Sequence, residues 1–118
     1  MAKIVVLDDI AEAVTLIRKI LERKGHEVVG FTEEEEAIAY AQAHAVDLAI
    51  LDIKLKKMSG IEVLAEIRKV NPAVKVIMLT GYPTLETAKD AVRLGASEYC
   101  VKPFEKEELE EKVADVLK

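Results

Sequence analysis

The sequence contains one cysteine, no Lys/Arg block of the kind that binds nucleic acid and no long hydrophobic run. A single cysteine, Cys100, excludes an internal disulfide framework and is typical of a reducing compartment. The formal net charge of −5 opposes nonspecific binding to nucleic acid or to anionic membranes. No apolar stretch approaches the roughly 20 residues that a membrane-spanning helix needs. We therefore expect a cytoplasmic protein that does not itself bind nucleic acid or membrane.

The chain also lacks a linker, an internal repeat, a low-complexity tract and a signal-peptide hydrophobic region after Met1. Its 118 residues match one domain of common size, and they exclude a second catalytic domain within this chain. We therefore expect residues 1–118 to form a single domain.

Short apolar runs alternate with segments of helical period along the whole chain. The five runs lie at residues 3–7, around Val28 and Val29, and at residues 49–51, 74–79 and 99–101. This alternation is typical of a parallel sheet with helices on both faces. We expect an α/β, doubly wound (βα)5 fold of flavodoxin type, with a five-stranded parallel sheet in the order 2-1-3-4-5.

Two capping boxes predict where helices begin. Thr32 and Glu35 predict one helix start, and Ser59 and Glu62 predict another. We interpret the acidic run at residues 33–36 as a solvated first helical turn favoured by the helix dipole, and not as a metal site. The helix expected at about residues 84–94 has only a weak apolar stripe, so it should be the most loosely packed. That stripe contains Ala88, Ala91 and Val92.

Polar side chains follow four of the five apolar runs. They are Asp8 and Asp9 after the first run, Asp52 after the third, Thr80 after the fourth and Lys102 after the last. In an open α/β sheet the ligand crevice lies beyond the carboxyl ends of the strands, so these groups should meet there. Carboxylates separated by ~4 Å would repel one another by an energy on the order of 4 kcal/mol per pair at an effective dielectric near 20. Such a site must bind a cation or hold a proton.

Oxygen ligands on strand ends suit Mg²⁺, and a carboxylate beside Mg²⁺ can attack phosphorus to form an aspartyl phosphate. Thr80 and Lys102 would then hold the phosphoryl oxygens. Two of the candidate residues also have a structural interpretation. Asp9 and Glu12 form a helix-capping pattern, and Tyr99 could cover the edge of the sheet with its hydroxyl in water.

Four segments resemble the receiver domain of two-component response regulators, and the likeness spans the whole chain. They are Leu7-Asp8-Asp9, Leu51-Asp52, Leu79-Thr80-Gly81 and Val101-Lys102-Pro103-Phe104. The resemblance implies that Asp52 accepts a phosphoryl group from a phosphohistidine of a sensor histidine kinase. It implies that Asp9 and Asp52 bind Mg²⁺ directly, Asp8 binds it through water, and the backbone carbonyl of Lys54 is a further ligand.

The resemblance also implies how the signal leaves the site. Thr80 and Tyr99 are expected to move together on phosphorylation, which changes the surface of the fourth helix, fifth strand and fifth helix. The Lys102-Pro103 peptide bond is expected to be cis. Expected partners are the kinase and a downstream output domain or protein, with the chain a monomer or a phosphorylation-dependent dimer. Residues 80–88 and 94–99 are most similar to receivers of nitrogen-control activators.

The loop after Asp52 departs from the family pattern. Lys56 and Lys57 stand where the family usually has proline and glycine, and Ser59 stands where it usually has aspartate. As a hypothesis, Lys54 and Tyr82 control water access to the site and hence the lifetime of the aspartyl phosphate. Timing dephosphorylation of the Lys54→Ala and Tyr82→Ala proteins tests this idea, and an unchanged rate in both would reject it.

Two other functions compete with a self-phosphorylating and self-dephosphorylating switch. A small Mg²⁺-dependent phosphatase of haloacid dehalogenase type uses a similar aspartate, threonine and lysine set, but it carries aspartate-x-aspartate where this chain has adjacent Asp8 and Asp9. Steady turnover of a phosphate ester would favour it. A flavin or nucleotide carrier would place a diphosphate against carboxylates, and absorbance near 450 nm in the purified protein, about where flavins absorb, would favour it.

Overall fold

Five parallel strands form one sheet in the order β2-β1-β3-β4-β5, as the sequence predicts. The computed structural model describes residues 2–55, 57–81, 83–93 and 95–118. The strands are β1 (Lys3–Leu7), β2 (Glu27–Phe31), β3 (Leu48–Asp52), β4 (Lys75–Thr80) and β5 (Glu98–Val101). The helices are α1 (Ala11–Glu22), α2 (Glu34–Ala43), α3 (Gly60–Val70), α4 (Leu85–Arg93) and α5 (Lys106–Val116).

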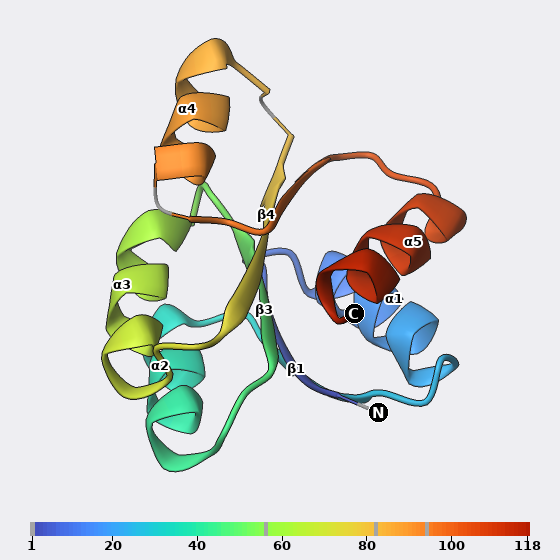
Figure 1. The fold of residues 1–118 in the computed structure, drawn as a ribbon, viewed down its shortest axis with the longest axis horizontal. Coiled ribbons are helices and arrows are strands. Elements are labelled where there is room, and N and C mark those ends of the chain that lie inside the picture. The colour runs from blue at the N-terminus through green and yellow to red at the C-terminus, as the bar shows by residue number, and fades with distance from the viewer. Residues whose placement is uncertain (1, 56, 82, 94) are drawn as a thin grey trace.

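Helices cover both faces of the sheet (Figure 1): α1 and α5 lie on one face, and α2, α3 and α4 lie on the other. Alternate residues of each strand supply the two cores. In β1, Ile4 and Val6 pack in the core beneath α1 and α5, whereas Val5 and Leu7 pack in the core beneath α2 and α3. This two-sided burial explains why the strands are continuously apolar.

The strand register brings the chemically active residues to one edge. Leu7 of β1 pairs with Leu51 of β3, and Thr80 of β4 pairs with Val101 of β5. Asp8, Asp52, Thr80 and Lys102 therefore all lie at the carboxyl edge of the sheet. The predicted fold and strand order are confirmed. The expected site lies between β1 and β3, at the topological switch point where the strand order reverses.

The predicted capping box at Ser59 is confirmed, but the one at Thr32 is wrong. Ser59 accepts a hydrogen bond from the backbone N–H of Glu62, and the Glu62 carboxylate accepts one from the N–H of Ser59. In contrast, α2 begins at Glu34, and its N-cap residue Glu33 makes no side-chain capping hydrogen bond. Glu33 itself has an extended backbone, so the N-cap lies one residue after Thr32, where the pattern predicts it.

The interpretation of residues 33–36 as a solvated turn is wrong for Glu34, which is fully buried. Its carboxylate turns inward because it accepts hydrogen bonds from the backbone N–H groups of Lys57 and Met58. Those donors lie more than 20 residues away in sequence, so no local pattern could indicate them.

Helix α4 is loosely packed, as expected, although its stripe is narrower than predicted. Ala91 is its only buried residue among those described, and Val92 is 79% exposed, contrary to the expected inward position. None of the described helices has both the length and the apolar character that a membrane span requires.

Candidate functional site

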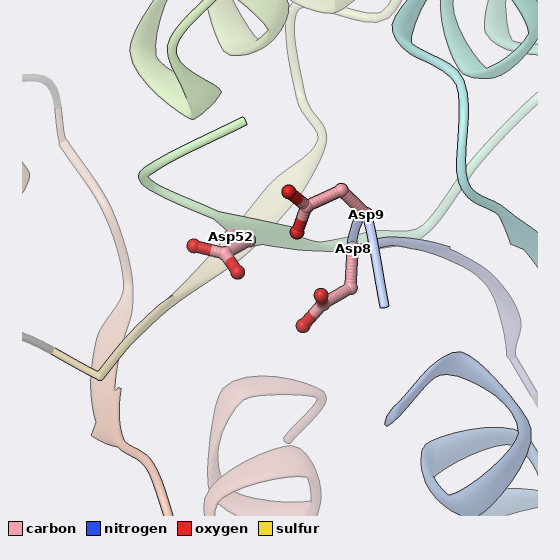
Figure 2. A group of neighbouring side chains, drawn as sticks. All are labelled: Asp8, Asp9 and Asp52. Carbon is pink, nitrogen blue, oxygen red and sulfur yellow. The ribbon is translucent and has the colours of Figure 1, made fainter. Parts of the chain in front are cut away.

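Three carboxylates gather where β1 and β3 end. One carboxylate oxygen from each of Asp8, Asp9 and Asp52 can be chosen so that all three lie within 4.8 Å of one another. Figure 2 shows the three side chains converging from these two strand ends. Asp8 and Asp52 are buried, whereas Asp9 is partly exposed. The cluster could hold a metal ion, and its all-oxygen character suits a hard cation such as Mg²⁺.

Backbone hydrogen bonds fix the orientation of the two buried carboxylates. Oδ1 of Asp8 accepts from the N–H of Ile10 at 2.9 Å, and Oδ1 of Asp52 accepts from the N–H of Lys54 at 2.9 Å. In both cases the donor lies two residues further along the chain, as in an Asx turn. The second oxygen of each carboxylate is thereby directed toward the other members of the site.

Lys102 joins these two carboxylates from the opposite end of the chain. Its Nζ lies 2.6 Å from Oδ2 of Asp8 and 2.7 Å from Oδ2 of Asp52. Burial works against the ammonium charge, but the hydrogen bonds to Asp52 and Asp8 outweigh it and raise the pKa of Lys102. One ammonium cannot neutralise three carboxylates, so the site as a whole favours a further cation.

Burial raises the pKa of Asp52, and the hydrogen bond from Lys102 offsets this effect only in part. The negative charge of Asp8 acts in the same direction as burial. Asp52 is therefore a carboxylate whose ionised form is disfavoured by its surroundings. Such a group gains from contact with an added positive centre.

One pocket brings together five of the predicted site residues. It is lined by Asp9, Ile10, Asp52, Lys54, Thr80, Gly81 and Lys102. Thr80 is buried at the end of β4, and its backbone oxygen accepts a hydrogen bond from the N–H of Lys102 at 2.7 Å. Of the candidate site residues, Tyr82 lies outside the described residues, so its predicted tuning role stays a prediction.

Tyr99 does not simply cover the sheet edge with its hydroxyl in water. The hydroxyl lies 2.8 Å from Oγ1 of Thr87 in α4. Thr87 in turn exchanges hydrogen bonds with Thr84 immediately before the helix, because the side-chain oxygen of each accepts the backbone N–H of the other. Tyr99 therefore links β5 to the start of α4. The Lys102-Pro103 peptide bond beyond β5 is cis, as expected.

Sequence reasoning missed two residues that shape the site. A Cβ atom on Gly60 would lie 2.2 Å from the backbone oxygen of Asp52, so only glycine allows α3 to begin against the end of β3. Glu34 holds the loop between Asp52 and α3, as described above. The glycine directly after the Ser59 cap was a usable signal for close approach. Glu34 had no such signal.

Several solved structures of response regulator proteins have the same fold as this chain. A CheY-like receiver domain protein from Methanospirillum hungatei superimposes with a TM-score of 0.93 and 34% identity, covering 99% of this chain and 94% of that chain. CheY4 from Vibrio cholerae also gives a TM-score of 0.93, with 29% identity and 99% coverage of both chains. NtrX from Brucella abortus gives 0.91 with 34% identity, covering 98% of this chain and 27% of its own.

Relatives identified by sequence are regulators of larger size. HssR, a heme response regulator of Staphylococcus saprophyticus, is 36% identical over 118 residues, which is 100% of this chain and 52% of that protein. PhoP, an alkaline phosphatase synthesis transcriptional regulatory protein of Bacillus subtilis, is 35% identical over 116 residues, covering 98% of this chain and 48% of its own length. The transcriptional regulatory protein ZraR of Salmonella typhimurium is 31% identical over 114 residues, covering 97% of this chain and 26% of its own length. The chain thus spans between about a quarter and about a half of the length of these relatives.

The family model of the response regulator receiver domain matches residues 4–114, which include all four strand ends that carry the site. Relatives of the NtrC-like kind are among the matches, in agreement with the resemblance noted for residues 80–88 and 94–99. The strand order, the acidic cluster and these matches agree, and the chain belongs to the family of receiver domains of two-component response regulators.

Proposed function

We propose that the chain is a phosphorylation-controlled signalling switch that takes a phosphoryl group from a sensor histidine kinase onto Asp52 in the presence of Mg²⁺. The observation that carries this proposal is the cluster of Asp8, Asp9 and Asp52, with Lys102 bridging two of its members. Membership of the receiver family supports the identity of the donor.

Each residue of the site has a defined part in the transfer. A carboxylate oxygen of Asp52 attacks phosphorus, the new P–O bond forms, and the P–N bond to the kinase histidine breaks with its electron pair returning to the ring nitrogen. Lys102 and Thr80 hold the phosphoryl oxygens. Asp9, Asp52 and the carbonyl of Lys54 would bind Mg²⁺ directly and Asp8 through water. Bound Mg²⁺ supplies charge neutralisation for the phosphoryl group.

The direct test uses acetyl phosphate as a small phosphoryl donor. Incubation with donor and Mg²⁺ should add the mass of one phosphoryl group, and the gain should disappear when a chelator removes the metal. The product should then decay slowly by hydrolysis. Continuous release of phosphate from an unrelated phosphate ester would instead support the phosphatase of haloacid dehalogenase type, which membership of the receiver family does not favour.

We propose further that phosphorylation is read at the surface formed by α4, β5 and α5, through movement of Thr80 and Tyr99. The hydrogen bond between Tyr99 and Thr87 supports this route because it connects β5 to the weakly buried helix α4. The partner that reads this surface is an output domain or a separate protein. The chain would act in the cytoplasm as a monomer or as a phosphorylation-dependent dimer.

The Tyr99→Phe substitution tests the coupling between β5 and α4. It removes one hydroxyl and leaves the hydrogen bonds between Thr84 and Thr87 intact. The loss of one hydrogen bond should cost about 0.5–1.5 kcal/mol of unfolding free energy. The amide resonances of α4 should shift part of the way toward those of the protein activated with beryllofluoride. A spectrum of α4 identical to that of the unmodified protein would contradict the coupling.

A further inference from the structure

Glu34 is a buried charged residue outside the acidic cluster. Its side chain has no solvent exposure, although it is the first residue of α2. Oε2 accepts hydrogen bonds from the backbone N–H groups of Lys57 at 2.6 Å and Met58 at 3.0 Å. Oε1 is buried and has no hydrogen-bond partner among the described residues. A buried carboxylate is costly, so its position requires an explanation beyond general solubility.

The carboxylate is held in its charged form. Burial alone would raise the pKa of Glu34, but hydrogen bonds from its own backbone N–H and from those of Lys57 and Met58 outweigh burial and lower the pKa. Hydrogen bonds to an ionised acceptor are roughly twice as strong as those between neutral groups. At neutral pH the ionised Glu34 carboxylate therefore accepts two strong hydrogen bonds, from the N–H groups of Lys57 and Met58.

Lys57 and Met58, which Glu34 contacts, belong to the loop that directly follows the candidate phosphoacceptor Asp52. The N–H of Lys54 orients Asp52, and the N–H of Ile53 donates to the backbone oxygen of Leu79 at 3.0 Å. These contacts fix the beginning of the loop, at Ile53 and Lys54. Glu34 fixes its far half, close to where α3 begins. The loop is therefore held at both ends, by Asp52 at its start and by Glu34 at Lys57 and Met58.

Surface ion pairs in the same region contribute much less. Nζ of Lys57 lies 3.3 Å from Glu35 and 3.9 Å from Glu33, and all three side chains are exposed. Exposed pairs of this kind stabilise a protein by about 0–1 kcal/mol. The buried contact of Glu34 with the loop backbone is therefore the dominant one, and Glu35 offers a matched control at the neighbouring position.

We propose that Glu34 is a positioning residue for phosphoryl transfer, which holds the loop backbone at Lys57 and Met58 in the position that the Asp52 site and the Lys54 carbonyl require. This inference rests on the proposed function. It concerns a residue that touches neither the phosphoryl group nor the metal, and it predicts that the site can be weakened from α2 without unfolding the protein.

Three variants test the proposal: Glu34→Ala, Glu34→Gln and the control Glu35→Ala. Each also loses one negative charge, so charge alone should affect them equally. In Glu34→Ala, Mg²⁺ affinity and the rate of phosphorylation by acetyl phosphate should fall about tenfold, the effect expected when a group supporting metal ligands is removed. Glu34→Gln keeps an oxygen that can accept both N–H groups, so it should recover much of the loss. Glu35→Ala should behave like the unmodified protein.

The measurements separate positioning from stability. Urea unfolding and the amide resonances of Lys57 and Met58 report whether each variant is folded and whether the two hydrogen bonds persist. If Glu34→Ala is unfolded, Glu34→Gln decides: its recovery is expected to be incomplete, so a rate that stays below that of Glu35→Ala supports the proposal, and a rate equal to that of Glu35→Ala overturns it. Folded Glu34 variants with normal Mg²⁺ affinity and normal rates would overturn it. An unmodified protein that gains no phosphoryl group at all would overturn the proposed function itself, a visibly different outcome.

Discussion

The Asp52→Asn protein is expected to gain no phosphoryl group under conditions that modify the unsubstituted chain fully. Asparagine has nearly the same shape as aspartate, but its amide lacks the charged oxygen that attacks phosphorus. Asp8 and Asp9 lie nearby, so a phosphoryl group on either of them would show in the same mass measurement. Intact mass after incubation with Mg²⁺ and acetyl phosphate measures the effect.

The same variant should remain folded. Like charges 4.8 Å apart repel by about 3.5 kcal/mol at an effective dielectric of 20, so removing one carboxylate relieves repulsion. Lys102 keeps its contact with Asp8 and is not left without a partner. The unfolding free energy without metal should therefore be unchanged or higher. Persistent phosphorylation of Asp52→Asn would move the acceptor to another residue.

The Lys102→Met protein is expected to lose about 3–5 kcal/mol of unfolding free energy at neutral pH, the usual cost of removing one partner from a buried ion pair. Asp8 and Asp52 are both buried and both lie within 2.7 Å of Nζ, so the substitution leaves two carboxylates without their ammonium. Methionine fills a similar volume, which limits the contribution of a cavity. Urea unfolding measures the loss.

Two features distinguish this electrostatic loss from a packing defect. The loss should shrink as the pH falls, because burial raises the folded pKa of Asp52, and the native state then binds a proton at this group before the unfolded chain does. It should also shrink in Mg²⁺, which binds the native cluster and stabilises it by mass action. Lys69→Met is the control, since Lys69 pairs with Glu66 on the surface. Equal losses in the two variants would contradict the assigned importance of Lys102.

The fold and most of the candidate site could be predicted from the sequence because their signals are short-ranged or repetitive. Each strand is an apolar run, and the carboxyl ends of parallel strands share one edge, so Asp8, Asp52, Thr80 and Lys102 could be placed together without knowledge of any contact. The cis bond at Pro103 came from the family resemblance. The local capping pattern at Ser59 was equally reliable because both partners lie on one helical turn.

The failures share a physical cause, namely contacts between segments that are remote in sequence. Thr32 and Glu35 match a capping box, but Glu34 finds stronger donors in the loop after Asp52, and α2 starts later as a result. Val92 matches the apolar period of α4, but among the described residues of this helix only Ala91 is buried, and the Val92 side chain faces solvent. Thr87 could not be linked to Tyr99 before the packing of α4 was known.

Peptide mapping of the unsubstituted protein is the most direct test of the account. The protein is treated with Mg²⁺ and acetyl phosphate, and borohydride then converts any aspartyl phosphate to homoserine, which marks the acceptor permanently. A single converted residue, Asp52, is expected, with no conversion when Mg²⁺ is chelated. Conversion of Asp8 or Asp9, or labelling that is independent of the metal, would contradict it.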